Sequence, residues 1–90
     1  MLYMVIEHFK EGAAPEIYGR LREQGRLMPE GLNYVSSWIS DDWKTCWQVM
    51  ETNDFALFEK WIANWKDLMD FKIVPVRTSA EARELMTGKS

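Results

Sequence analysis

The segment from Leu32 to Thr52 most constrains the fold of this chain, because two strand-like runs in it flank the polar pair Asp41-Asp42, which suits a tight turn. Both arms are rich in β-branched and aromatic residues, which favour a pleated, half-buried surface. With the turn centred on the two aspartates, one face of the hairpin should carry large rings with small hydroxyls between them: Tyr34, Ser36, Trp38, Thr45, Trp47 and Val49. The opposite face should mix apolar and small polar groups: Asn33, Val35, Ser37, Ile39, Lys44, Cys46, Gln48 and Met50.

The residues before the hairpin predict one strand and one helix. Residues 2–9 (LYMVIEHF) are apolar on both faces of a strand, which is typical of a position in the centre of a sheet. Pro15 suits the first turn of a helix, and Ile17 and Leu21 belong to an apolar stripe that continues to Met28. We therefore expect a central strand followed by an amphipathic helix.

The residues after the hairpin repeat this pattern in reverse order. A second helix is expected over residues 55–69, from the stripe Phe55, Phe58, Trp61, Ile62, Trp65, Leu68 and Met69. Residues 70–77 predict a fourth strand, and Pro75 favours an edge position because proline cannot donate to a ladder. Thr78 and Glu81 form a capping-box pattern that predicts a short C-terminal helix over residues 80–86.

The order of these elements, strand–helix–strand–strand–helix–strand, predicts an α+β, ferredoxin-like βαββαβ fold with a four-stranded antiparallel sheet and two helices on one face. Ninety residues form a single domain, residues 1–90, with a core over 1–77 and a C-terminal helix and tail over 78–90. The second face of the sheet still carries apolar side chains. Because large exposed apolar patches mark interfaces, we expect a homodimer joined through its sheet faces.

Composition excludes several classes of function. A net charge of −3 argues against nucleic acid as a partner, and the basic, glycine-aromatic signature of RNA-recognition domains is absent. One histidine and one cysteine, without CxxC or HxxxH spacing, provide no metal site, and no cofactor is expected. The single Cys46 fits a reducing compartment, and neither a signal peptide nor a membrane-spanning apolar run is visible. We therefore expect a cytoplasmic protein that does not insert into membranes.

Several segments carry a resemblance to known proteins: LYMVIEHF, GRLMPEGLNYVSSWIS, CWQVMET, FALFEKWIANW and DFKIVPV. They resemble a family of small bacterial proteins described only as a domain of unknown function, over most of residues 1–77. More remotely, the arrangement is similar to the dimeric α/β-barrel group, which includes monooxygenases, muconolactone isomerases and haem-degrading enzymes. The resemblance implies a fold in which two ferredoxin-like sheets close into a barrel. It imports no definite activity and leaves haem binding open, with His8 as the one available histidine ligand.

Two residues are candidate catalytic groups. His8 is the sole histidine and shares a strand face with Met4 and Ile6, where it could transfer protons together with Tyr34. The alternative for His8 is a strand-end histidine satisfied by neighbouring groups. Glu7 points to the other face of the strand and is interpreted as a rim or ion-pair residue.

Four residues are candidate ligand contacts. Trp38, Trp47 and Ser36 could line a pocket for a flat apolar molecule, and aromatic core packing is the alternative interpretation of the same residues. Arg26 could hold a substrate anion or form a solvated ion pair with Glu23. The sequence thus favours a protein that binds a small apolar or aromatic molecule. A cofactor-independent monooxygenase- or isomerase-type enzyme using His8 and Tyr34, and a non-catalytic structural or interaction subunit, stay open as alternatives.

Overall fold

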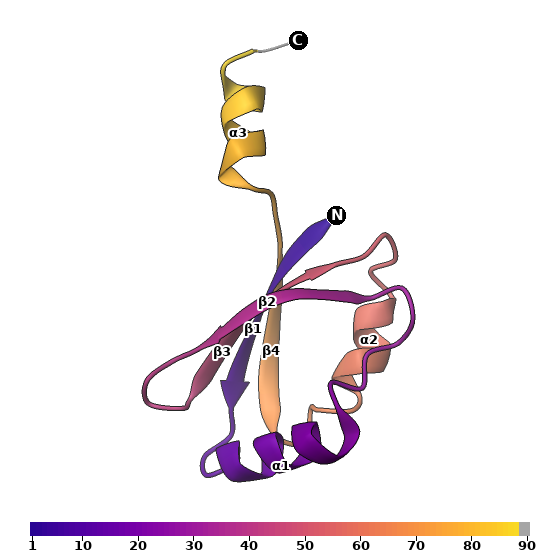
Figure 1. Cartoon of the computed structure of the whole chain (residues 1–90), viewed down its shortest axis with the longest axis vertical. Coiled ribbons are helices and arrows are strands. Elements are labelled where there is room, and N and C mark those ends of the chain that lie inside the picture. Colours follow the sequence, from indigo (N-terminus) through magenta and orange to yellow (C-terminus); the bar gives the residue numbers. More distant parts are fainter. Residues whose placement is uncertain (89–90) are drawn as a thin grey trace.

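The computed structural model describes residues 1–88, so residues 89 and 90 of the expected tail lie outside the described part. Its elements follow the expected order (Figure 1): β1 (Leu2–Phe9), α1 (Ala14–Gln24), β2 (Asn33–Ile39), β3 (Thr45–Glu51), α2 (Leu57–Ile62), β4 (Met69–Val76) and α3 (Ser79–Met86). The four strands form one antiparallel sheet in the order β2-β3-β1-β4. The predicted α+β, ferredoxin-like fold is confirmed, with β1 in the interior of the sheet and the proline-bearing β4 at an edge.

The hairpin of β2 and β3 forms, but its turn is longer than the expected pair of aspartates. Ser40 N–H donates to the Thr45 carbonyl at 2.8 Å, and Trp38 lies opposite Trp47 rather than opposite Thr45. The Ser40 hydroxyl accepts from the Lys44 and Thr45 N–H groups, which stabilises a four-residue loop over residues 41–44. This shift of two residues leaves the side chains of β3 on their expected faces, because side chains alternate with a period of two.

A β-bulge in β2 overturns one part of the predicted hairpin. The register shifts between Tyr34 and Ser36, so Val35 is the extra residue and Tyr34 pairs with Met50. Tyr34 therefore lies on the face that the helices cover, and Asn33 opposite Glu51 lies on the other face. The expectation that Tyr34 shares a face with Ser36 and Trp38 was wrong, because a one-residue bulge inverts every side chain beyond it.

Both core helices are shorter than predicted. α1 ends at Gln24 and is followed by Gly25, whose φ of 70° is in the left-handed region, and Leu27 also has a positive φ, of 57°. α2 ends at Ile62, and residues 63–68 continue as turns closed by bonds such as Trp65 N–H to the Ile62 carbonyl at 2.9 Å. The apolar stripe predicted that the chain continues to turn on the same face through residue 68, but it did not predict that residues 63–68 lose regular α-helical geometry.

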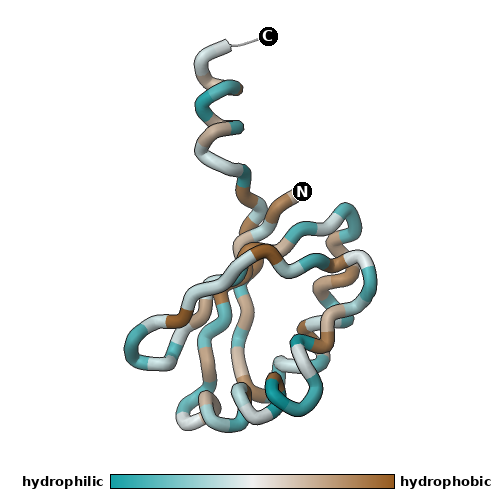
Figure 2. The backbone as a smooth tube through the Cα atoms, viewed as in Figure 1, coloured by the Kyte–Doolittle hydropathy of each residue, from teal (hydrophilic) through white to brown (hydrophobic). Residues whose placement is uncertain are grey.

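α1 and α2 pack on one face of the sheet, and the core lies between them and the strands. Its buried members come from every layer: Val5, Ala13, Ile17, Leu32, Met50, Phe58, Trp61, Trp65, Leu68 and Met69. Hydrophobic positions alternate with paler ones along the strands and α2, whereas the turn between β2 and β3 is mostly hydrophilic (Figure 2). In residues 1–88, none of the helices has the length and apolar character needed to cross a membrane.

The opposite face of the sheet, which we call the open face, carries the side chains of alternate strand residues. Leu2, Met4, Ile6 and His8 of β1 lie on it, with Ser36, Trp38, Trp47 and Val49 of the hairpin beside them. α3 begins with the predicted cap, in which the Thr78 hydroxyl accepts from Glu81 N–H at 3.0 Å. α3 extends away from the sheet and buries none of its residues (Figure 1).

Candidate functional site

A cavity of about 100 Å³ lies between the helices and the covered face of the sheet. One part of its wall is apolar and largely aromatic: Phe9, Ile17, Leu21, Trp61, Trp65 and Met69. The other part is polar: Glu7, Tyr18, Arg26, Ser37, Cys46 and Gln48. An apolar wall with a few placed polar groups is typical of small-molecule sites.

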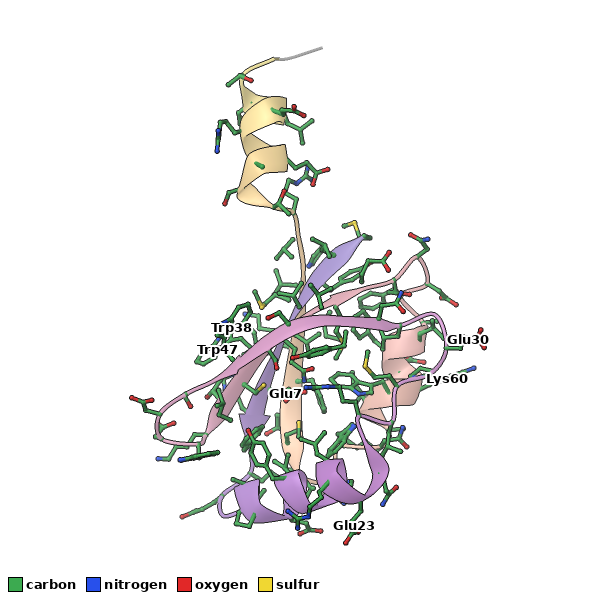
Figure 3. All side chains as sticks on the ribbon, in the orientation of Figure 1. Glu7, Glu23, Glu30, Trp38, Trp47 and Lys60 are labelled. Atoms are coloured by element: carbon green, nitrogen blue, oxygen red, sulfur yellow. The ribbon has the colours of Figure 1, made fainter. Side chains whose placement is uncertain are left out.

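Glu7 is the charged residue at the centre of the polar wall. It follows Val5 on the covered side of β1, and only 4% of it is exposed. Gln48 Nε2 donates to its Oε2 at 2.5 Å, and Cys46 lies opposite it in the register of β1 and β3. Figure 3 shows Glu7 inside the molecule, between the strands and the helices. The structure therefore corrects the interpretation of Glu7 as a rim or ion-pair residue.

Burial raises the pKa of Glu7 from 4.5 to about 7, because a carboxylate loses its hydration there. Hydrogen bonds from Cys46 and Gln48 and the charge of Arg26 lower the pKa but offset only part of this effect. A carboxyl group of this kind is present in both protonation states near neutral pH. Perturbed groups of this kind concentrate at functional sites, although buried structural networks also produce them.

Gln48 connects Glu7 to Arg26. Its Oε1 accepts from Arg26 Nη1 at 3.1 Å, while its Nε2 donates to Glu7, so both ends of the amide are used. The Arg26 guanidinium also lies over the Tyr34 ring, with Cζ 3.7 Å from the ring centroid. Arg26 thus contacts Gln48 and Tyr34, and the expected alternative of a solvated ion pair with Glu23 is not what the described side chains form.

Two tryptophans fix the backbone that carries Arg26. Trp61 Nε1 and Trp65 Nε1 both donate to the Arg26 carbonyl, at 3.1 Å and 3.0 Å, and Asn64 donates to the Leu27 carbonyl at 3.2 Å. The turns after α2 are also joined to α1, because Arg20 of α1 donates two N–H groups to the carboxylate of Asp67. Trp61 and Trp65 therefore line the cavity and also hold the backbone that carries the Arg26 guanidinium.

Cys46 faces the same cavity but is not a ready nucleophile. Burial and the adjacent Glu7 charge raise its pKa to about 12, so the thiol stays protonated at neutral pH. His8 lies opposite Thr45 on the open face, so the histidine is not available to activate the thiol. Within residues 1–88, no group of three or more histidine, cysteine or acidic side chains is arranged to hold a metal ion.

The residues that the sequence nominated do not form one site. Arg26 lines the cavity, whereas Tyr34 does not line it but contacts the Arg26 guanidinium with its ring. The Tyr34 hydroxyl lies 2.7 Å from Ser37 Oγ. His8, Ser36, Trp38 and Trp47 lie on the open face, where Trp38 is 58% exposed. Figure 3 shows Trp38 and Trp47 together, apart from Glu7. The sheet therefore separates His8 from Tyr34, and their proposed joint role in proton transfer stays a prediction.

Sequence analysis missed Glu7, Gln48 and Tyr18, although one signal was present. Glu7 occupies the position between Val5 and Phe9 in an alternation whose other members are apolar. A carboxyl group in the middle of a buried face is unusual, because charged residues are rarely buried without a partner. That pattern identifies Glu7 without any knowledge of the helices.

A second hollow, of about 490 Å³, lies outside the core between the β1–α1 loop and the β2–β3 turn. Its charged lining residues, Lys10, Glu11, Asp42 and Lys44, are exposed to solvent. Tyr18 and Trp43 pack edge-to-face between this hollow and the cavity, with ring centroids 5.7 Å apart. We take the smaller cavity as the candidate site, because its polar groups are buried and connected to one another.

A search among curated proteins finds no match for this chain. A family model described as "Domain of unknown function (DUF3303)" matches residues 1–90, which is the full length given. This chain therefore belongs to the DUF3303 family, a family of domains of unknown function.

Proposed function

We propose that this protein binds a small, largely apolar molecule in the cavity between its helices and its sheet. The observation that carries the proposal is the division of the cavity wall into an aromatic part and a connected polar part. Aromatic faces favour a flat ligand, and the few polar groups fix its orientation.

The size of the cavity limits the ligand. A buried cavity of about 150 Å³ accommodates benzene, and pockets for drug-sized molecules span about 300–1,000 Å³. A cavity of about 100 Å³ therefore encloses a molecule smaller than benzene, or one end of a larger molecule that extends through its opening. This size excludes complete burial of a haem or a polycyclic molecule.

Phenol is a suitable probe for this proposal, because it combines one ring with one hydroxyl and can enter the cavity with part of the molecule remaining in the opening. Titration in ¹H–¹⁵N NMR should shift the indole signals of Trp61 and Trp65, which line the cavity. Leu21→Trp should weaken binding by filling the cavity, whereas Trp38→Ala, on the open face, should leave it unchanged. Shifts confined to Trp38 and Trp47 would instead favour the aromatic pocket expected from the sequence. A spectrum that does not change at high phenol concentration would instead favour a non-catalytic structural or interaction subunit.

A second candidate function is catalysis by a cofactor-independent enzyme of the isomerase or monooxygenase type. Glu7 favours it, because a buried carboxyl with a pKa of about 7 can both accept and donate a proton at neutral pH. The same function was expected to use His8 and Tyr34, and substitution of His8 by alanine tests that role separately. An active His8→Ala variant would remove the histidine from the mechanism.

We also propose that the open face is covered by a second copy of this chain. Half-buried apolar side chains of β1, including Met4 and Ile6, lie there beside the exposed rings of Trp38 and Trp47. Analytical ultracentrifugation should show a dimer, and Ile6→Asp should convert it to a folded monomer, because burying an unpaired charge is costly. A monomeric wild-type protein would contradict this proposal and leave the cavity proposal unaffected.

A further inference from the structure

Three polar side chains in the cavity wall form one connected row. Glu7 accepts from Gln48, and Gln48 accepts from Arg26, so a carboxyl group and a guanidinium are separated by the length of one amide. All three side chains line the cavity. The row therefore presents an acid–base group and a cation to the same small volume.

The neutral residue between the two charges matters chemically. A direct ion pair with arginine would hold the Glu7 carboxylate ionised and lower its basicity. With Gln48 interposed, burial dominates the pKa of Glu7, and the charge of Arg26 has a smaller effect on it than burial or the hydrogen bonds from Cys46 and Gln48. The guanidinium has five N–H donors, of which Gln48 engages one among the described residues, so others can face a ligand.

The Gln48 amide also defines the spacing between Glu7 and Arg26. Its oxygen meets Arg26 and its nitrogen meets Glu7, across the atoms O=C–N. A carbonyl compound has the same span across O=C–C. A ligand lying alongside this amide would therefore place its oxygen near the Arg26 guanidinium and its adjacent carbon near the Glu7 carboxylate.

We propose that the cavity is a proton-transfer site for small carbonyl compounds with an acidified C–H bond, in which Glu7 moves the proton and Arg26 binds the carbonyl oxygen. The inference rests on the proposed binding of a small molecule in this cavity and specifies its class. The aromatic part of the wall receives the apolar remainder of the ligand.

The proposed reaction needs no co-reactant. The Glu7 carboxylate takes a proton from the carbon next to the carbonyl, the C–H electron pair moves into a new C=C bond, and the carbonyl π pair moves to the oxygen. Arg26 stabilises the negative charge that develops on that oxygen. The protonated Glu7 then returns the proton to the oxygen or to another carbon, so the product is a tautomer or double-bond isomer and the carboxylate is restored.

The basicity of Glu7 narrows the substrate class further. Proton transfer is most effective when the pKa of the base lies near the working pH, and the C–H acid must be acidic enough for a base of this strength. A C–H bond between two carbonyls, or one conjugated with a second unsaturated group, meets this condition. An unactivated ketone does not, so we assign 1,3-dicarbonyl and related enolisable compounds.

Pentane-2,4-dione is the probe for this inference, since it is compact and its enol absorbs in the ultraviolet. After dilution from acetonitrile into buffer, the approach to keto–enol equilibrium should be faster with protein than without it. Glu7→Gln should remove the acceleration, a loss on the order of 100-fold for a general acid–base group, while the diketone still binds. Glu23→Gln is the matched control, because Glu23 is exposed on the outer side of α1 (Figure 3).

The pH profile gives a second readout that a structural role for Glu7 would not produce. The rate should rise with the ionised fraction of Glu7, through its pKa of about 7, and then level off. The groups that face Glu7 are Cys46 and Gln48 from β3, Tyr18 from α1, and Arg26 from the segment before β2, while β4 contributes the uncharged Phe71. The pKa values of Cys46 and Tyr18 are raised, so neither thiol nor phenol should titrate in this range.

Each outcome decides the inference. Acceleration that depends on Glu7 and follows this profile supports it. Three outcomes would overturn the inference and leave the proposed binding function intact. In the first, pentane-2,4-dione binds but reaches keto–enol equilibrium no faster than in buffer. In the second, wild type and Glu7→Gln equilibrate it at equal rates, and in the third phenol binds but the diketone does not. Failure of both probes to bind would overturn both.

Discussion

Substitution of Glu7 by glutamine should change how the stability of this protein depends on pH. The folded state raises the pKa of Glu7 from 4.5 to about 7, mainly by burial, so folding favours the protonated carboxyl. Between pH 4.5 and 7 the folded protein holds more protons than the unfolded chain. The contribution of Glu7 is therefore complete below about pH 4.5 and is lost as the pH rises through 7.

The size of this effect follows from the same values. A rise in pKa from 4.5 to about 7 corresponds to about 3 kcal/mol, at about 1.4 kcal/mol for each pH unit. Wild-type protein should lose about this much stability between pH 4 and 8 relative to Glu7→Gln, which cannot ionise. At acid pH the variant should be the less stable of the two by about 1 kcal/mol, because the amide has one more donor than the protonated carboxyl group, at a buried position toward which Gln48 already directs a donor.

Urea denaturation followed by tryptophan fluorescence at several pH values measures this difference. The Glu23→Gln variant controls for general charge effects, because Glu23 is exposed on α1. A difference between wild type and Glu7→Gln that stays constant from pH 4 to 8 would refute the reasoning. It would mean that the carboxyl group is hydrated in solution and that the cavity is more open than its geometry indicates.

Three further predictions concern the surroundings of the cavity. Trp61→Phe and Trp65→Phe should each cost about 1 kcal/mol in urea denaturation, and the double variant should cost more than their sum, because the Arg26 carbonyl then loses both donors. Gly31→Ala should destabilise the protein more than Gly12→Ala. Both glycines have a positive φ, which costs alanine about 1–2 kcal/mol, but only the Cβ added at Gly31 would meet a neighbour, Leu57, at 3.0 Å. Equal losses of stability in thermal denaturation would contradict this prediction. Removal of residues 78–90 should leave the unfolding free energy of the monomer nearly unchanged, because α3 buries none of its described residues; a large loss would show that α3 packs against the body.

Much of the fold could be predicted from local patterns. The apolar run of β1, the proline in β4 and the Thr78 cap each determine one element through a short-range rule, and the structure confirms all three. The bulge at Val35 could not be predicted, because β-branched residues are favourable in a regular strand and no glycine marks the irregularity. That single residue decided on which face Tyr34 lies.

The candidate site was less predictable than the fold, because it depends on contacts across the sheet. Gln48 and Arg26 are 22 positions apart and meet only after the hairpin and the loop after α1 are in place. Trp38 and Trp47 are the most prominent aromatic residues of the hairpin, but they lie on the open face, away from the cavity. The more informative signal was a lone carboxyl at position 7, where the alternation of β1 requires an apolar side chain.

The alternation of side chains across this sheet also bears on how the family can evolve. Trp47 and Gln48 are adjacent in the chain, yet one belongs to the open face and the other to the cavity. A point substitution can therefore change the side chains of one face in one lineage while those of the other face are retained. An insertion or deletion of one residue in β1 or β3 would exchange both sets of side chains at once. We therefore expect length changes among relatives to fall in the loops, and substitutions at even and odd positions of these strands to accumulate at independent rates.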